Sequence, residues 1–123
     1  MKPRTPGFWL IVATVGLLAL LPMQALAGMT PEEVKVFEGY KAKAETGDRV
    51  AQFTLGNCYA NGEGVAKDEI EAYAYYNLAG MTHKDARKNL AILEMEISRD
   101  GIASGQQRTK QLQKEIEAKR AGK

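Results

Sequence analysis

Apolar residues recur at helical spacing on both sides of a glycine-rich turn. Small and large apolar residues alternate along one face of each predicted helix, with Ala51, Leu55 and Tyr59 before the turn and Ala72, Tyr75 and Ala79 after it. Between the helices, Asn61-Gly62-Glu63-Gly64 tolerates positive φ and ends the first helix. Asp68 begins the second helix, where a carboxylate suits the helix dipole. The pattern predicts a closely packed helix hairpin.

The same spacing returns after 35 residues, which indicates an internal repeat. The pair Ala51 and Leu55 reappears as Ala86 and Leu90, and the pair Tyr40 and Ala44 reappears as Tyr75 and Ala79. We therefore expect one domain over residues 28–120. It would hold a partial leading repeat, a complete repeat over about 48–80, and a degenerate capping repeat over about 83–119, followed by a frayed tail at 121–123.

Local signals place the other helices. Thr30-Pro31-Glu32-Glu33 combines an N-cap threonine, a proline at the first helical position and a capping-box glutamate, which predicts a helix over about 30–46. Its apolar positions are Val34, Val36, Phe37 and Tyr40. A fourth helix begins at 82–85 and carries the stripe Ala86, Leu90, Leu93 and Ile97.

A final helix is predicted over about 104–119, folding back on the fourth helix through Leu112 and Ile116. Its outer face is strongly polar and comprises Arg108, Lys110, Lys114, Glu115 and Lys119. The predicted fold class is all-α, with about five helices.

The first 27 residues have the features of a secretory signal peptide. Lys2 and Arg4 precede an apolar run over 8–21, and Ala25-Leu26-Ala27 is a small-residue cleavage site. The run is shorter than the roughly 20 residues that a membrane-spanning helix needs. We expect a periplasmic or secreted protein without a membrane segment after cleavage. The alternative is an uncleaved segment that anchors the chain.

Charge argues against a nucleic-acid partner. The chain has 17 basic and 15 acidic residues, and Lys2 and Arg4 leave with the predicted signal, so the remaining charges balance. Residues 28–80 carry nine acids and five bases, whereas residues 81–123 carry six acids and ten bases. This asymmetry fits either two solvated faces or a basic tail that meets an acidic partner.

Few residues suggest chemistry. His83 is the only histidine and lies at a predicted helix start, where we expect an ordinary exposed side chain. Cys58 is the only cysteine, so it is either a small buried apolar residue or an exposed thiol that pairs between chains. One histidine and one cysteine fall short of a structural zinc site. The sequence therefore predicts no catalytic, cofactor-binding or metal-ligating residue.

At the hairpin the chain resembles the Sel-one-like repeat family, which is related to the tetratricopeptide repeats. The family pattern A-x-x-x-L-G-x-x-Y-x-x-G-x-G-V-x-x-D-x-x-x-A-x-x-W/Y-x-x-x-A is matched at eleven typed positions. Val65 is one of these eleven positions. The other ten are predicted to be structural and are Ala51, Leu55, Gly56, Tyr59, Gly62, Gly64, Asp68, Ala72, Tyr75 and Ala79. The resemblance implies an α/α solenoid that scaffolds protein partners.

The following repeat departs from the family pattern. The positions equivalent to Gly56, Tyr59, Gly62 and Gly64 hold Ala91, Glu94, Ile97 and Arg99. Because the glycine turn is missing, the fourth helix is expected to exceed the family length, continuing to Asp100 and ending at Gly101.

The resemblance also suggests partner-contact residues. First helices line the concave surface of tandem helix repeats, which points to Arg49, Gln52, Asn57 and Asn89. Three tyrosines within four positions, 73, 75 and 76, cannot all face one core, so at least one should be exposed. Tyr75 matches the buried aromatic of the family, leaving Tyr73 or Tyr76 as a partner anchor.

The sequence thus predicts an exported, non-catalytic module that binds a protein or peptide partner. One alternative is a self-associating structural envelope protein, because a single complete repeat buries little core. The other is a cell-wall or β-lactam-directed hydrolase, suggested only by a branch of the family whose repeats contain paired cysteines that this chain lacks.

Overall fold

The computed structural model describes residues 28–122, and the segment predicted as a signal peptide, 1–27, lies outside them. Within this range the chain forms helices and no strand. The helices are α2 (Pro31–Ala44), α3 (Arg49–Asn61), α4 (Glu69–Ala79), α5 (Lys84–Glu96) and α6 (Arg99–Ala121). The predicted all-α class and the number of helices are confirmed.

Side-chain caps begin four of the helices. At α2, Thr30 Oγ1 accepts from the Glu33 amide (3.1 Å) while Glu33 Oε2 accepts from the Thr30 amide (2.8 Å), so the predicted capping box is confirmed. Asp48 caps α3, Asp68 caps α4 through the amides two and three residues on, and Ser98 caps α6. These bonds satisfy amides that would otherwise lack a partner.

The glycine turn between α3 and α4 packs on α2. Gly62 and Gly64 both have positive φ, 73° and 71°. A Cβ on Gly64 would lie 2.4 Å from the carbonyl oxygen of Glu33 and 2.9 Å from the Cβ of Phe37. Gly64 is therefore needed both for its backbone conformation and for the close approach of the turn to α2.

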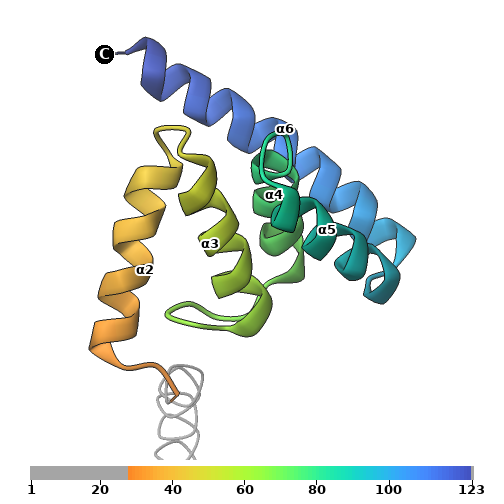
Figure 1. Cartoon of the computed structure of the whole chain (residues 1–123), viewed down its shortest axis with the longest axis horizontal. Helices are drawn as coiled ribbons and strands as arrows, with labels where there is room; N and C mark the ends of the chain where they lie inside the picture. Colours follow the sequence, from red (N-terminus) through yellow and green to blue (C-terminus); the bar gives the residue numbers. More distant parts are fainter. Residues whose placement is uncertain (1–27, 123) are drawn as a thin grey trace, which may run out of the picture.

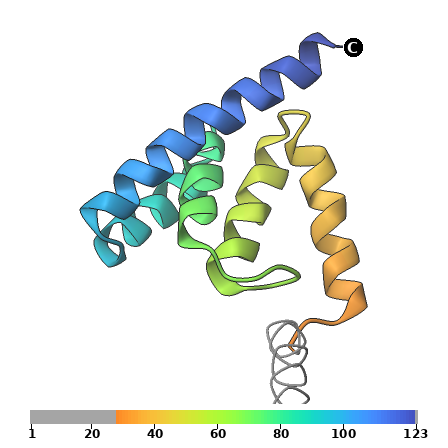
Figure 2. The ribbon, with the colours of Figure 1, turned by 180° about the vertical axis from the view of Figure 1, so that it is seen from behind.

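Helix α4 lies at the centre of the fold, in contact with α3, α5 and α6, while α2 packs on α3 alone among these contacts. Figures 1 and 2 show α2 and α3 side by side, with the long α6 crossing the ends of α3 and α4 toward the α2–α3 turn. Leu112 and Ile116 of α6 join the core cluster that contains Phe37, Ala44 and Leu55. In the last turn of α6, Lys119 forms an ion pair with Glu45, which caps the C-terminal end of α2.

The end of α5 and the course of α6 differ from the sequence prediction. Helix α5 ends at Glu96 rather than Asp100 and has 13 residues, as α3 does, so the expected extension is wrong. Ile97 is extended and Ser98 caps α6 through the amide of Gly101, which places Gly101 inside the helix instead of ending one. A serine cap thus replaces the glycine turn. Helix α6 also packs mainly on α4, whereas we expected it to pack on α5.

Candidate binding face

Helix α3 leaves one face open. Val50, Thr54, Asn57 and Asn61 follow one another at helical spacing and are exposed or half-buried, whereas Ala51 and Leu55 are buried in the core. Val50 is 60% exposed. We call this the open face of α3. Helix α3 itself lies between α2 and the pair of helices α4 and α5 (Figure 1).

A groove of about 480 Å³ lies between α2 and the open face of α3. Its walls are largely apolar and come from Val36, Phe37, Tyr40, Thr54 and Cys58. Its rim is acidic and carries Glu32, Glu33 and Glu63. Val36 is 50% exposed there. Such a groove can bury an apolar side chain and place carboxylates beside its neighbours.

A smaller depression of about 110 Å³ lies on the other side of α3, against α5. Ala60 contributes to it from α3, and Asn89, Ile92 and Glu96 contribute from α5. Ile92 is 48% exposed. The open face of α3 therefore runs between two depressions, and we call the three parts together the binding face.

Three of the predicted partner-contact residues meet beside this face. The Tyr76 hydroxyl donates to Asn57 Oδ1 (2.8 Å), and Asn89 Nδ2 donates to the same oxygen (3.2 Å). The cluster links α3, α4 and α5. Asn57 and Asn89 are half-buried, so parts of both side chains remain accessible to a partner.

The expectation for Gln52 is wrong, because its side chain is fully buried. Gln52 Nε2 donates to the Ala44 carbonyl (3.2 Å), and Gln52 Oε1 accepts from Arg49 Nη1 (3.1 Å). Arg49 Nη1 also donates to the Leu78 carbonyl (2.9 Å), so its guanidinium joins α3 to the end of α4. Successive residues turn about 100° around a helix, so Gln52, two residues before Thr54, points away from the open face.

All three tyrosines of α4 are buried, so the expectation that Tyr73 or Tyr76 is exposed is wrong. Tyr73, Tyr75 and Tyr76 are 2%, 3% and 4% exposed. Because α4 is surrounded, each ring meets a different neighbour: Tyr73 packs on Gly105 of α6, and Tyr76 packs on Gly56 of α3. Tyr75 stacks on Tyr59. Tyr73 also donates its hydroxyl to Glu94 (3.0 Å).

His83 and Cys58 are more enclosed than ordinary surface residues. The His83 ring stacks on Phe53 with centroids 4.5 Å apart, and its Nδ1 is buried without a hydrogen-bond partner among residues 28–122, so the expected exposed side chain is not found. Cys58 is 8% exposed. Burial, and next the charge of Glu63, raises the pKa of its thiol. The buried alternative for Cys58 is therefore correct.

The groove residues Val36, Phe37, Tyr40, Thr54 and Cys58 were not among the predicted partner contacts. One signal was available, because Val36 and Phe37 are adjacent on a helix and cannot both face a single neighbouring helix. Over residues 28–122, no cluster of three or more metal-ligating side chains occurs, and no helix has the length and apolar character needed to cross a bilayer.

Comparison with known proteins gives no relative. No family model, no curated protein and no solved structure matches the chain.

Proposed function

We propose that this chain is an exported Sel-one-like repeat protein of solenoid type, which binds a protein or peptide partner on the binding face without catalysing a reaction. The groove between α2 and α3 is the observation that carries this proposal, because a largely apolar groove of about 480 Å³ is a ready site for an anchoring side chain. The glycine turn supports the family assignment, since both Gly62 and Gly64 adopt positive φ.

The charge of the groove suggests the chemistry of the partner. Glu32, Glu33 and Glu63 surround its apolar walls, and residues 28–80 have four more acids than bases. A segment with an exposed apolar side chain flanked by lysine or arginine complements this surface. Association should accordingly slow as the salt concentration rises.

The state of Cys58 favours binding over chemistry in the groove. A thiol that attacks a substrate needs a lowered pKa, whereas burial raises the pKa of Cys58. The groove contains no histidine that could activate the thiol.

The test is a substitution that fills the groove. Within the described part of the chain, Thr54 Oγ1 bonds only to the Val50 carbonyl of its own helix (3.0 Å). Thr54→Arg should therefore leave the fold intact while the arginine side chain occupies the groove and pairs with the acidic rim. Partner capture from the exported fraction by cross-linking should be lost in Thr54→Arg and retained in the control Ala103→Arg, which adds the same charge on the exposed part of α6. Equal capture by both folded variants would refute the placement on this face.

A second copy of the chain is a specific rival partner. The excess of four bases over acids in residues 81–123 complements the acidic half. Sedimentation across a concentration range tests it: a mass that rises with concentration in the wild type and stays monomeric in Thr54→Arg would identify self-association through the groove.

A further inference from the structure

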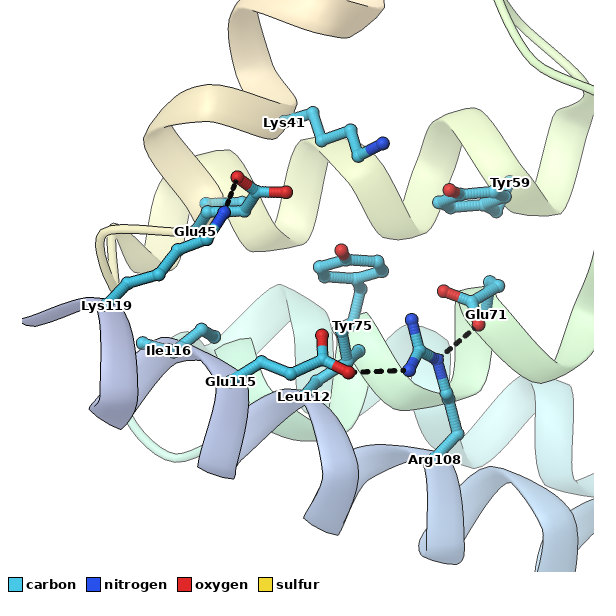
Figure 3. Close-up of a pocket in the computed structure, with 11 residues that line it drawn as sticks. Lys41, Glu45, Tyr59, Glu71, Tyr75, Arg108, Leu112, Glu115, Ile116 and Lys119 are labelled. Atoms are coloured by element: carbon cyan, nitrogen blue, oxygen red, sulfur yellow. Dashed lines mark hydrogen bonds and ion pairs between the residues drawn. The ribbon is translucent and has the colours of Figure 1, made fainter.

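A second, polar pocket of about 220 Å³ lies where α2, α3, α4 and α6 meet (Figure 3). Its lining shares no residue with the groove. At about 30 Å³ per water molecule, the pocket has room for about seven waters, which is the size of one amino-acid residue rather than of a drug-sized ligand.

Two tyrosine hydroxyls face this pocket. The rings of Tyr59 and Tyr75 are stacked, with centroids 5.8 Å apart and planes 7° apart, and Figure 3 shows both hydroxyls directed into the space. Over residues 28–122 the hydroxyls of Tyr73 and Tyr76 are the tyrosine hydroxyls that form hydrogen bonds, so those of Tyr59 and Tyr75 stay open to the pocket, although Tyr75 as a whole is 97% buried. Burial is the main cause that raises the pKa of Tyr59 to about 12 and that also raises the pKa of Tyr75, and the charge of Glu71 contributes to both shifts. Both groups are therefore neutral donors at physiological pH.

Lys41 supplies a third donor. Its ammonium is directed into the pocket in Figure 3 and forms no ion pair with any residue of the range 28–122. The other cations of the pocket are paired: Arg108 lies 2.5 Å from Glu71 and 3.4 Å from Glu115, and Lys119 pairs with Glu45. Among the donors of the pocket, Lys41 and the two hydroxyls are therefore the ones that form no bond to a side chain of the range 28–122.

The charges of the pocket narrow the class of ligand. Three carboxylates and three cations line it, so it is formally neutral. A phosphate dianion would meet the carboxylates of Glu71 and Glu115 as well as the donors, and a metal cation would meet Lys41. A group that carries a carboxylate next to an N–H matches both the free donors and the carboxylates of the pocket.

We propose that this pocket binds an α-carboxylate, either of a free amino acid or of the C-terminal residue of a peptide. The carboxylate accepts from Lys41 Nζ and from the hydroxyls of Tyr59 and Tyr75, and the adjacent N–H donates toward Glu115. The side chain packs on the apolar part of the lining, which is formed by Ala44, Leu112 and Ile116. A small or branched aliphatic residue fits this space.

The experiment is calorimetric titration of the full chain with three probes: L-leucine, N-acetyl-alanyl-leucine, and the same dipeptide as its carboxamide. The carboxylate dipeptide or L-leucine should bind, and the carboxamide should not. Binding of L-leucine alone identifies a free amino acid as the ligand, and tighter binding of the dipeptide identifies a peptide terminus. Binding of the carboxamide as tight as that of the carboxylate, or no binding by any probe, overturns the proposal.

Matched variants locate the site. Lys41→Met keeps the length of the side chain and removes the charge, and should weaken binding about tenfold or more. Tyr75→Phe removes one buried donor and should weaken it several-fold, whereas Lys43→Met, an exposed lysine in the same last turn of α2, should leave it unchanged. Unchanged affinity in Lys41→Met also overturns the proposal. Thr54→Arg should leave titration of this pocket unaffected, so failure here and failure of the proposed groove are distinguishable.

Discussion

Replacing Gly56 by alanine tests whether the hairpin depends on the close contact between α3 and α4. A Cβ at this position would lie 2.4 Å and 2.5 Å from two ring carbons of Tyr76. The ring cannot easily retreat, because it is 4% exposed and its hydroxyl donates to Asn57. Overpacking of this kind costs about 1–3 kcal/mol, and loss of the hydrogen bond costs about 1 kcal/mol more.

Alanine also has a higher helix propensity than glycine, by about 0.8–1.0 kcal/mol, which offsets part of this cost. We expect Gly56→Ala to lower the free energy of unfolding by about 1–3 kcal/mol. Gly39→Ala is the matched control, since Gly39 lies inside α2 and a Cβ there would meet nothing within 4 Å. This variant should gain about 0.8–1.0 kcal/mol from propensity alone.

Urea and thermal unfolding followed by circular dichroism measure both changes. For a domain of this size, 1 kcal/mol corresponds to about 4–8 °C in Tm, so the two variants should move Tm in opposite directions. If Gly56→Ala proves as stable as the wild type or more stable, the contact between Gly56 and Tyr76 is not limiting and the packing argument fails.

Three further predictions follow from the described contacts. Asp68→Ala removes the side-chain cap of α4 and should cost about 1 kcal/mol of stability in urea unfolding, while full stability would mean that the cap contributes nothing. Burial and nearby charge raise the pKa of Tyr59 from 10.0 to about 12, so the folded state holds the tyrosine proton more tightly than the unfolded state does. The free energy of unfolding should therefore fall as pH rises from 10 toward 12. Tyr59→Phe should flatten this loss, and an alkaline profile identical to that of the wild type would contradict the prediction. Cys58 should react slowly with a thiol reagent in the native protein and quickly in denaturant, because burial both shields the thiol and raises its pKa; equal rates would show that it is exposed.

The helices could be predicted well because their signals are local. The capping box at Thr30, the aspartate at 68 and the glycines at 62 and 64 act through bonds or torsions within a few residues. Two misplaced boundaries show the limit of this reasoning: α5 ends at Glu96 rather than Asp100, and α6 begins at Arg99 rather than at about residue 104. The preceding repeat ends its first helix with a glycine turn, whereas here an extended Ile97 ends one helix and the hydroxyl of Ser98 begins the next.

The candidate sites were harder to predict because they depend on which face of each helix is covered. Gln52 was expected at the surface and is fully buried. Its side chain donates to the Ala44 carbonyl and accepts from Arg49, which in turn donates to the Leu78 carbonyl, so its burial depends on residues outside α3. The groove depends on α2 lying beside Thr54 and Cys58. The polar pocket brings Lys41 and Arg108 together across 67 positions of sequence.

The sequence by itself determined the helical class, the register of the hairpin and most of the helix ends, because hydrogen bonds between near neighbours and the helical period decide these features. Only the tertiary structure decided that α4 is enclosed by α3, α5 and α6, so that the rings of Tyr73, Tyr75 and Tyr76 are all buried although they leave the helix in different directions. It alone also directed Arg108 of the predicted outer face into a pocket with Glu71. The physical reason is that burial is a property of neighbours distant in the chain, and a local pattern records which residues are apolar but not which helix will cover them.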